Sequence, residues 1–300
     1  MTNSSLLQGS IVALLTPMTH DEKIDFPALE RLVDLHVDAG TRAIVVASTT
    51  GEGPTLSLKE HVLLYRAAVL CAEGRIPVIG GVGSPSTHVA CELAREAANE
   101  QVDAILCVTP YYNRPNSLGL RRHFMAVAEA TDTPVILYDV PHRTGVALPE
   151  DLIVELSAHP NIIGLKDATR DLHRAERLLR AVGAEFQILS GDDSTAFALM
   201  AAGGAGVISV AANVAPSAVR AMCDAVRRAD MRDAARIDET LRPLYDLLSA
   251  DTNPVPAKWL AHRIGWMNAT LRLPLVIPPE LSRCLSESVA LNACETLLGH

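Results

Sequence analysis

Lysine is scarce in this chain of 300 residues. Only four lysines occur among the 26 Lys+Arg, so arginine supplies nearly all the positive charge. The formal net charge is -9, and no block of like charge occurs. This pattern disfavours nucleic acid and anionic membranes as partners, because both require clustered positive charge. A lysine used so sparingly indicates a task that arginine cannot perform.

Cysteine spacing of the metal-binding type is also absent. The six cysteines are scattered without a CxxC pair, and most lie in apolar contexts. We therefore expect reduced, buried thiols in a cytoplasmic protein. The amino-terminal stretch "MTNSSLLQGSIVALL" has no basic region, so we do not expect a signal peptide.

Charge is missing altogether from residues 194–219, a stretch long enough to span a bilayer. The stretch is rich in small residues and has Gly203 and Gly204 near its middle. A helix, a tight turn and a fully buried strand explain it better than a membrane span does. We therefore expect no transmembrane segment here.

What the chain does contain is an alternation of short β-branched runs with amphipathic helical patterns. The runs are continuously apolar, which is typical of parallel strands covered on both faces. Several helical patterns begin with a capping residue, such as Ser57 or Ser86. The expected strands are residues 10–17, 42–48, 76–82, 103–110, 134–140, 161–166, 186–191 and 205–212.

Eight such units predict an α/β fold, a (β/α)8 TIM barrel with a C-terminal helical extension. A doubly wound sheet is the alternative, but its Gly-rich dinucleotide fingerprint after the first strand is missing. We expect the barrel, which carries the active site, to span residues 1–224 and the helical extension to span 225–300. Residues 216–250 fit one or two long helices, and "NPVPAKWLAHRIG" begins another.

Lys166 ends the apolar run "NIIGLK", the sixth expected strand. The active site of this fold lies at the carboxyl ends of the strands. A lysine in an apolar barrel mouth loses hydration when charged, so its pKa falls and the neutral amine can form a Schiff base with a ketone. Arginine stays protonated and cannot do this. The alternative is an ordinary ion pair with Asp167 or Asp192 at the barrel rim.

Tyrosine is the second clue, because three of the five tyrosines (Tyr111, Tyr112 and Tyr138) lie at the ends of expected strands. Tyr138, together with the hydroxyls of Thr49 and Thr50, is a candidate proton carrier for imine chemistry. For the adjacent pair Tyr111 and Tyr112, the residues alone fit either simple packing or a protein–protein contact.

Two further features are candidates for binding carboxylates. Arg143 presents a guanidinium that fits a carboxylate, and its alternative role is a rim salt bridge. The "STTGE" segment is either a plain turn or a turn whose N–H groups hold a carboxylate.

Six motifs resemble, in order and spacing, the dihydrodipicolinate synthase / N-acetylneuraminate lyase superfamily. They are "STTGE", "TPYYNRP", "YDVPHRTG", "GLKDAT", "SGDD" and "GVISVAANV". The likeness runs from about Gly9 to "TNPVPAKW" and "TLRLPL", which is nearly the whole chain. The double threonine, Arg143 and these late segments resemble the synthases more than the sialic acid lyases.

The resemblance implies a Schiff-base lyase that condenses pyruvate with L-aspartate-4-semialdehyde in lysine and diaminopimelate biosynthesis. It implies that Lys166 forms the Schiff base, while Tyr138, Thr49 and Tyr112 relay protons. Tyr112 would reach into a neighbouring subunit's site, so the family pattern implies a homodimer or a tetramer of dimers. The implied substrate-binding residues are Thr50 for the pyruvate carboxylate, Arg143 for the semialdehyde carboxylate, and the carbonyls of Gly191 and Ile208. No metal or organic cofactor is implied.

Some positions depart from the family pattern. Ser48, Asp139 and Asp167 replace the usual glycine, asparagine and glutamate, and we expect these changes to be tolerated. At the positions that bind lysine in feedback-inhibited members the chain has Leu58, Pro85 and Val89, while His61 matches one of the expected histidines. We therefore expect weak or absent inhibition by lysine.

Two other functions stay open at the level of the sequence. One is an aldolase or dehydratase acting on another 2-keto acid, since the superfamily uses the same lysine for several reactions. The other is a paralogue that binds a keto acid without turning it over.

Overall fold

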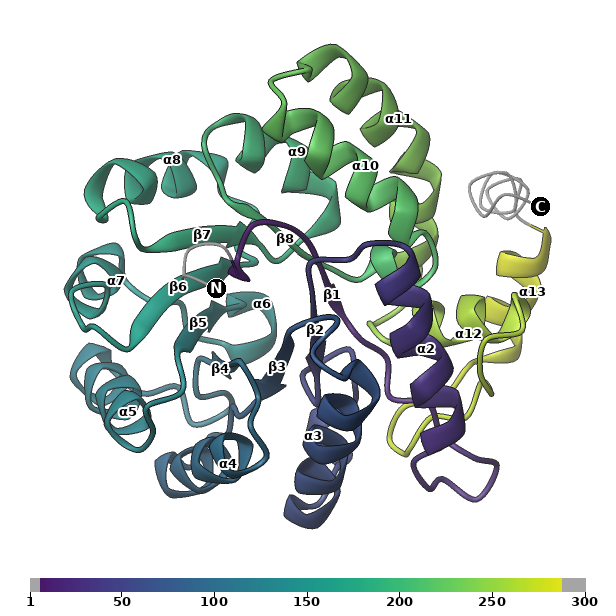
Figure 1. Ribbon diagram of the computed structural model, residues 1–300, viewed down its shortest axis with the longest axis horizontal. Helices are drawn as coiled ribbons and strands as arrows, with labels where there is room; N and C mark the ends of the chain where they lie inside the picture. The colour runs from purple at the N-terminus through teal and green to yellow at the C-terminus, as the bar shows by residue number, and fades with distance from the viewer. Residues whose placement is uncertain (1–5, 288–300) are drawn as a thin grey trace.

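Eight parallel strands form a closed barrel in the computed structural model, which describes residues 6–287 (Figure 1). Each strand pairs with its neighbours in sequence, and β8 closes the barrel against β1. The strands are β1 Gly9–Ala13, β2 Ala43–Val46, β3 Val78–Gly81, β4 Ala104–Val108, β5 Val135–Asp139, β6 Ile162–Asp167, β7 Gln187–Ser190 and β8 Gly206–Ser209.

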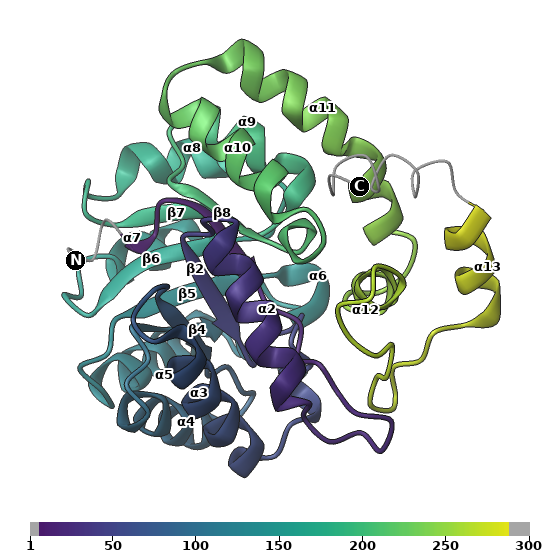
Figure 2. The same cartoon turned by 45° about the vertical axis from the view of Figure 1, so that its right-hand side comes forward.

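Helices surround the barrel on its outside (Figures 1 and 2). They are α2 Phe26–Asp38, α3 Leu58–Ala72, α4 Thr87–Asn99, α5 Ser117–Glu129, α7 Glu150–Leu156, α8 Leu172–Ala181, α9 Asp193–Ala201 and α10 Pro216–Arg227. The short helix α6 Pro141–Thr144 instead lies near the centre of the ring in Figure 1, and the 3-10 turns η1 Gly53–Thr55 and η2 Ala211–Asn213 follow β2 and β8. Ser57 and Ser86 cap α3 and α4 as expected. The (β/α)8 prediction is confirmed.

The strands are buried on both faces, which explains their continuous apolar character. Alternate residues point to opposite sides of a strand. Ile11, Ile79 and Ile136 fill the barrel interior, while Val12, Ile105 and similar residues pack between barrel and helices. The paired segments are shorter than the apolar runs. Buried loop residues such as Leu14 extend the first run beyond the last barrel hydrogen bond.

Three further helices follow the barrel: α11 Met231–Leu248, α12 Val255–Arg263 and α13 Pro279–Glu287. Helix α11 packs against α10 and α9, and α12 packs against α11 and η2. Figure 2 shows α12 and α13 to one side of the ring. The expected C-terminal helices are thus present. The division at residue 224/225 falls inside α10 and stays a prediction.

The uncharged stretch 194–219 forms most of α9, a turn, strand β8 and the start of α10. Its small residues allow this close folding; a Cβ on Gly204 would lie 1.9 Å from the Leu199 side chain. Among the described residues, no helix has the length and apolar character needed to cross a membrane.

Candidate active site

Lys166 and Tyr138 lie side by side at the carboxyl ends of β6 and β5. The two residues are direct partners in the parallel register of these strands. The Lys166 ammonium nitrogen lies 4.3 Å from the centre of the Tyr138 ring, and the two residues are 3% and 5% exposed. Strand pairing, rather than a flexible loop, therefore fixes the amine beside the phenol.

The surroundings of Lys166 favour the neutral amine. Burial lowers its pKa to about 8, opposed by the charge of Asp193 and assisted by that of Arg143. Near pH 8 about half of the side chain is then deprotonated, whereas a lysine of ordinary pKa is almost entirely charged. Such an amine can attack a carbonyl carbon.

The two acids considered as ion-pair partners of Lys166 are both bound elsewhere. Asp167 binds Arg174, with 2.6 Å between Oδ2 and Nη1, and Asp192 binds Arg170, with 2.7 Å between Oδ2 and Nε. The structure shows no ion pair of Lys166 within residues 6–287. A simple rim salt bridge does not account for this lysine.

The Tyr138 hydroxyl is hydrogen-bonded to Thr49, which follows β2. Burial raises the pKa of Tyr138, and the charge of Arg143 and the Thr49 hydrogen bond oppose this rise. The phenol is therefore protonated at neutral pH. With the Thr49 hydroxyl it forms a short chain of groups that can pass a proton to or from the site of the amine.

A cavity of about 340 Å³ lies at this end of the barrel. Five of the eight residues predicted for the site line it: Thr50, Tyr138, Arg143, Lys166 and Gly191. The volume suits a small organic acid. The amine of Lys166, the guanidinium of Arg143 and the hydroxyls of Thr50 and Tyr138 line the same space.

The segment after α11 completes this cavity through Asn253. Its side-chain amide donates to the Thr50 hydroxyl oxygen at 2.9 Å, and its carbonyl oxygen accepts from Arg143 Nη2 at 3.1 Å. Arg143 therefore has no rim salt bridge within the described chain, and its guanidinium is held by a neutral group. This leaves its positive charge available to an anion.

Three predicted residues lie outside the main cavity. Thr49 lines a neighbouring cavity of about 180 Å³ together with Arg143. Ile208 is buried in the barrel interior in the same cluster as Tyr138. Tyr112 is 92% exposed, has a positive φ of 69°, and lines neither cavity. One chain therefore does not bring Tyr112 to the site.

The model of the dihydrodipicolinate synthetase family matches residues 6–287 of this chain. This chain belongs to that family. A curated relative, 4-hydroxy-tetrahydrodipicolinate synthase of Shewanella sp. (strain ANA-3), is 50% identical over 271 residues, which cover 90% of this chain and 92% of that protein.

Solved structures of family members superpose closely. The dihydrodipicolinate synthase of Aquifex aeolicus has a TM-score of 0.94 and 41% identity, covering 98% of this chain and 100% of that one. The chloride-inhibited enzyme of Acinetobacter baumannii, complexed with pyruvate, has a TM-score of 0.93 and 42% identity, covering 96% and 99%. These likenesses support the family resemblance drawn from the six motifs.

Within this family member, several residues that line the cavity were not predicted for the site, among them Asp193, Tyr245 and Asn253. Asp193 accepts hydrogen bonds from the Val210 and Ala211 amides, at 3.0 and 2.9 Å, and from the Ser209 hydroxyl. The second acid of "SGDD" was the available signal for Asp193. Tyr245 and Asn253 come from α11 and the loop after it, so a search restricted to strand ends misses them.

The positions that bind lysine in feedback-inhibited family members differ here in character. Leu58 and Val89 are exposed apolar residues. His61 is buried, and its two ring nitrogens contact the Gly53 carbonyl oxygen and the Tyr65 hydroxyl, each at 3.1 Å. The matching histidine is therefore already engaged within the chain.

Metal-ligand clusters are absent from the described part of the chain: no group of three or more His, Cys, Asp or Glu residues is arranged to hold an ion. The carboxylates near the cavity are bound instead by arginines and amides, as in the Asp192–Arg170 and Asp139–Arg174 pairs.

Proposed function

We propose that this chain condenses pyruvate with L-aspartate-4-semialdehyde to give 4-hydroxy-tetrahydrodipicolinate. The chain is a lyase of the dihydrodipicolinate synthetase family, and its curated relatives bear the name of this activity. The observation that carries the proposal is the buried amine of Lys166, without an ion-pair partner in residues 6–287 and 4.3 Å from the Tyr138 ring centre.

Lys166 is the proposed nucleophile. Its neutral amine adds to C2 of pyruvate, and the carbonyl oxygen leaves as water to give the imine. Loss of a proton from C3 then gives an enamine, whose C3 attacks the aldehyde carbon of the second substrate. The amino group of that substrate finally replaces Lys166 at C2, which closes the ring and frees the enzyme.

Tyr138 and Thr49 are the proposed proton carriers, because each of these steps moves a proton near the Lys166 nitrogen. The hydrogen bond between the two hydroxyls supports this role. We assign Tyr112 to the same relay in a neighbouring subunit. The large exposed area of its ring supports a contact with a second copy of the chain. A homodimer, alone or paired into a tetramer, is therefore part of the proposal.

Thr50 and Arg143 are the proposed carboxylate-binding residues. Thr50 lies in a turn, and no hydrogen bond to the Thr50 or Gly51 amide is found within the described residues. These N–H groups and the Thr50 hydroxyl suit the pyruvate carboxylate. Arg143 suits the carboxylate of the semialdehyde. The carbonyl oxygens of Gly191 and Ile208 complete the proposed pocket.

A cytoplasmic location belongs to the same proposal. The four cysteines whose side chains the structure describes (Cys71, Cys91, Cys107 and Cys223) are free thiols. Reduced thiols fit a reducing compartment.

Borohydride trapping with pyruvate tests the chemistry directly. We expect a reduced pyruvate adduct on Lys166 by peptide mass spectrometry, and none in the Lys166→Arg variant. Lys59→Arg, at an exposed position of α3, is the matched control and keeps the adduct. An intact wild-type protein without an adduct contradicts the proposal.

Coupled assays then identify the acceptor. We expect turnover with L-aspartate-4-semialdehyde to exceed that with other aldehydes by at least about 100-fold, since a site built for a carboxylate rejects acceptors that lack one. A preference for a sugar aldehyde supports the aldolase alternative. An adduct without turnover on any acceptor supports the binding paralogue.

A further inference from the structure

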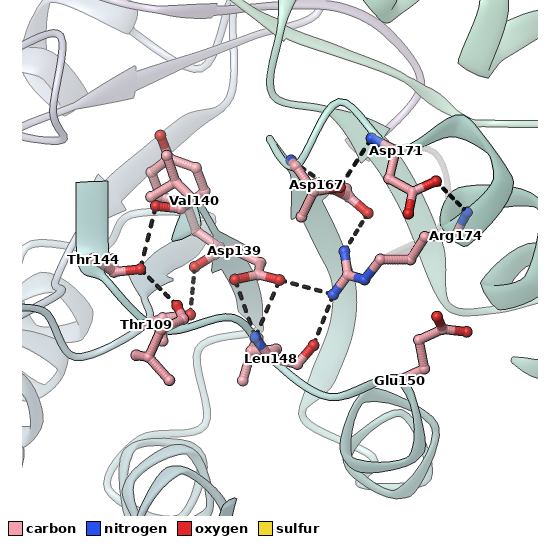
Figure 3. A network of polar contacts seen from close by, with 12 residues as sticks. Thr109, Asp139, Val140, Thr144, Leu148, Glu150, Asp167, Asp171 and Arg174 are labelled. Carbon is pink, nitrogen blue, oxygen red and sulfur yellow. Dashed lines mark hydrogen bonds and ion pairs between the residues drawn. The ribbon is translucent and has the colours of Figure 1, made fainter. Parts of the chain in front are cut away.

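Arg174 lies behind the site, between the barrel and its helices, and binds two carboxylates at once. It projects from α8 and is 7% exposed. Its Nη1 lies 2.6 Å from Asp167 Oδ2, and its Nη2 lies 2.7 Å from Asp139 Oδ2. Figure 3 shows the guanidinium between the two acids.

These acids directly follow the two central residues of the site. Asp139 follows Tyr138 on β5, and Asp167 follows Lys166 on β6. The register pairs Tyr138 with Lys166 and Asp139 with Asp167. Because side chains alternate along a strand, the first pair faces the cavity and the second faces the helices. Arg174 thus joins the outer faces of the two strand ends that carry the phenol and the amine.

The bridge is also tied to its surroundings. Arg174 Nη2 donates to the Leu148 carbonyl oxygen at 2.8 Å, and the Leu148 amide lies 3.2 Å from each oxygen of Asp139. Asp167 Oδ1 accepts from the Thr169 amide at 2.9 Å and from its hydroxyl at 2.6 Å. The carboxylates therefore have little freedom to move (Figure 3).

The main chain of Asp167 extends the bridge to the next strand end. Its carbonyl oxygen accepts from the Gly191 amide at 2.7 Å. Gly191 lines the cavity beside Lys166. A shift of Asp167 therefore moves two cavity residues together.

Stability alone does not explain this arrangement. One arginine and two aspartates give the cluster a net charge of −1 in a buried place. Burial raises the pKa of Asp139 to about 6, although Arg174 and the Leu148 amide oppose the rise. Replacing buried ion pairs by apolar groups is often neutral or stabilising. The bridge is better understood as a device that fixes geometry.

We propose that Arg174 is a positioning residue. By binding the carboxylates of Asp139 and Asp167, it keeps the neighbouring Tyr138 hydroxyl and Lys166 amine in the relative position that catalysis requires; this contact of one guanidinium with two carboxylates is called the clamp below. The inference depends on the proposed function, since it concerns the geometry of the imine and proton-transfer steps. Displacement of a catalytic group by about 1 Å lowers a rate by roughly 100-fold. The clamp is expected to affect turnover more than substrate affinity.

Two variants separate the clamp from its charge. Arg174→Lys keeps the positive charge but lacks the planar fork that reaches both acids. The double variant Arg174→Gln with Asp139→Asn removes one positive and one negative charge, so the cluster stays at −1 without a bridge. Arg177→Gln is the matched control: Arg177 lies on the same helix and makes an exposed ion pair of 2.7 Å with Glu150.

The experiment measures exchange of the pyruvate methyl protons for deuterium by NMR, without aldehyde, together with kcat and KM of the full reaction. The Tm of every variant is first measured by circular dichroism, and all assays are run at a temperature below the lowest of these values. We expect both clamp variants to lose about 10- to 100-fold in exchange rate and kcat, with the KM for pyruvate within about threefold of wild type. The control stays within about twofold of wild type.

The outcomes are distinct. Folded clamp variants that exchange within about twofold of wild type overturn the positioning role and leave Arg174 a structural residue. A clamp variant whose Tm falls, but whose kcat at temperatures below that Tm equals the wild-type value, also shows that Arg174 has only a structural role. If the wild type itself neither exchanges pyruvate protons nor forms an adduct, the proposed function is wrong instead.

Discussion

Lys258 and Glu52 form a completely buried ion pair, with both side chains 0% exposed. Lys258 lies on α12 and also donates to the Thr270 carbonyl oxygen at 2.7 Å. Glu52 lies in the turn after β2, two residues beyond Thr50, and accepts from the Arg272 amide at 3.0 Å. The ion pair therefore connects helix α12 to the turn that contains Thr49 and Thr50.

Removing one member of this pair should strongly destabilise the protein. We expect Lys258→Met to lower the free energy of unfolding by about 3–5 kcal/mol, because it leaves the Glu52 carboxylate buried without a counter-charge. Adding Glu52→Gln should restore much of the loss. Urea unfolding measures the stability of the single and the double variant, and Lys59→Met, at an exposed position of α3, is the control. Equal stability of the single and double variants contradicts this account.

The pH dependence of adduct formation should follow Lys166. Because burial lowers its pKa to about 8, protonation blocks attack below that pH. We expect the initial rate of borohydride trapping to rise between pH 6 and 9 with a midpoint near 8. Mass spectrometry after short pulses gives this rate. A rate that rises in proportion to hydroxide from pH 7 to about pH 9.5, without levelling near pH 8, indicates a lysine of ordinary pKa.

Tyr138→Phe should lower kcat by about 100- to 1,000-fold, since it removes a proton carrier but keeps the ring against Lys166. The KM for pyruvate should change by no more than a few-fold. Steady-state kinetics at pH 7.5 measure both. Tyr65→Phe is the control: its buried hydroxyl donates to the Gly81 carbonyl oxygen, away from the main cavity. A Tyr138→Phe enzyme as active as this control excludes the proposed relay.

Asp139→Asn should stabilise the protein at neutral pH. The pKa of Asp139 is raised from 3.8 to about 6 in the folded state. The folded state therefore binds this proton more tightly, and stability falls as pH rises from about 4 to 6. Asparagine removes the effect, worth at most about 3 kcal/mol. Urea unfolding between pH 4 and 7 tests this; a variant with an unchanged pH slope refutes it.

Lysine should inhibit this enzyme weakly or not at all. Leu58 and Val89 offer no polar group to a lysine ligand, and the two nitrogens of His61 are engaged within the chain. We expect about 1 mM lysine, the upper end of the range typical of KM values and of physiological substrate levels, to leave the rate within about 20% of its value without lysine. A strong decrease at that concentration shows that other residues form a lysine site.

Local pattern was enough for the fold and for five of the residues that line the cavity. The eight apolar runs identify the strands because a parallel barrel buries both faces of each one. Once the strands are counted, Lys166, Tyr138 and Thr50 fall at the same end of the barrel by topology alone. Asn253 and Arg174 were not predicted, because their contacts join segments distant in the chain and no local signal marks them. Asp193 was missed although the motif "SGDD" contains it.

The sequence by itself determined that lysine is rare and that one lysine closes a buried strand. It did not determine which buried lysine has a carboxylate partner, since Lys166 and Lys258 are both buried. Only the tertiary structure decided this, by placing Glu52 against Lys258 and assigning Asp167 and Asp192 to arginines. A carboxylate partner favours the charged form of a buried amine, whereas an amine without such a partner gives up its proton more readily.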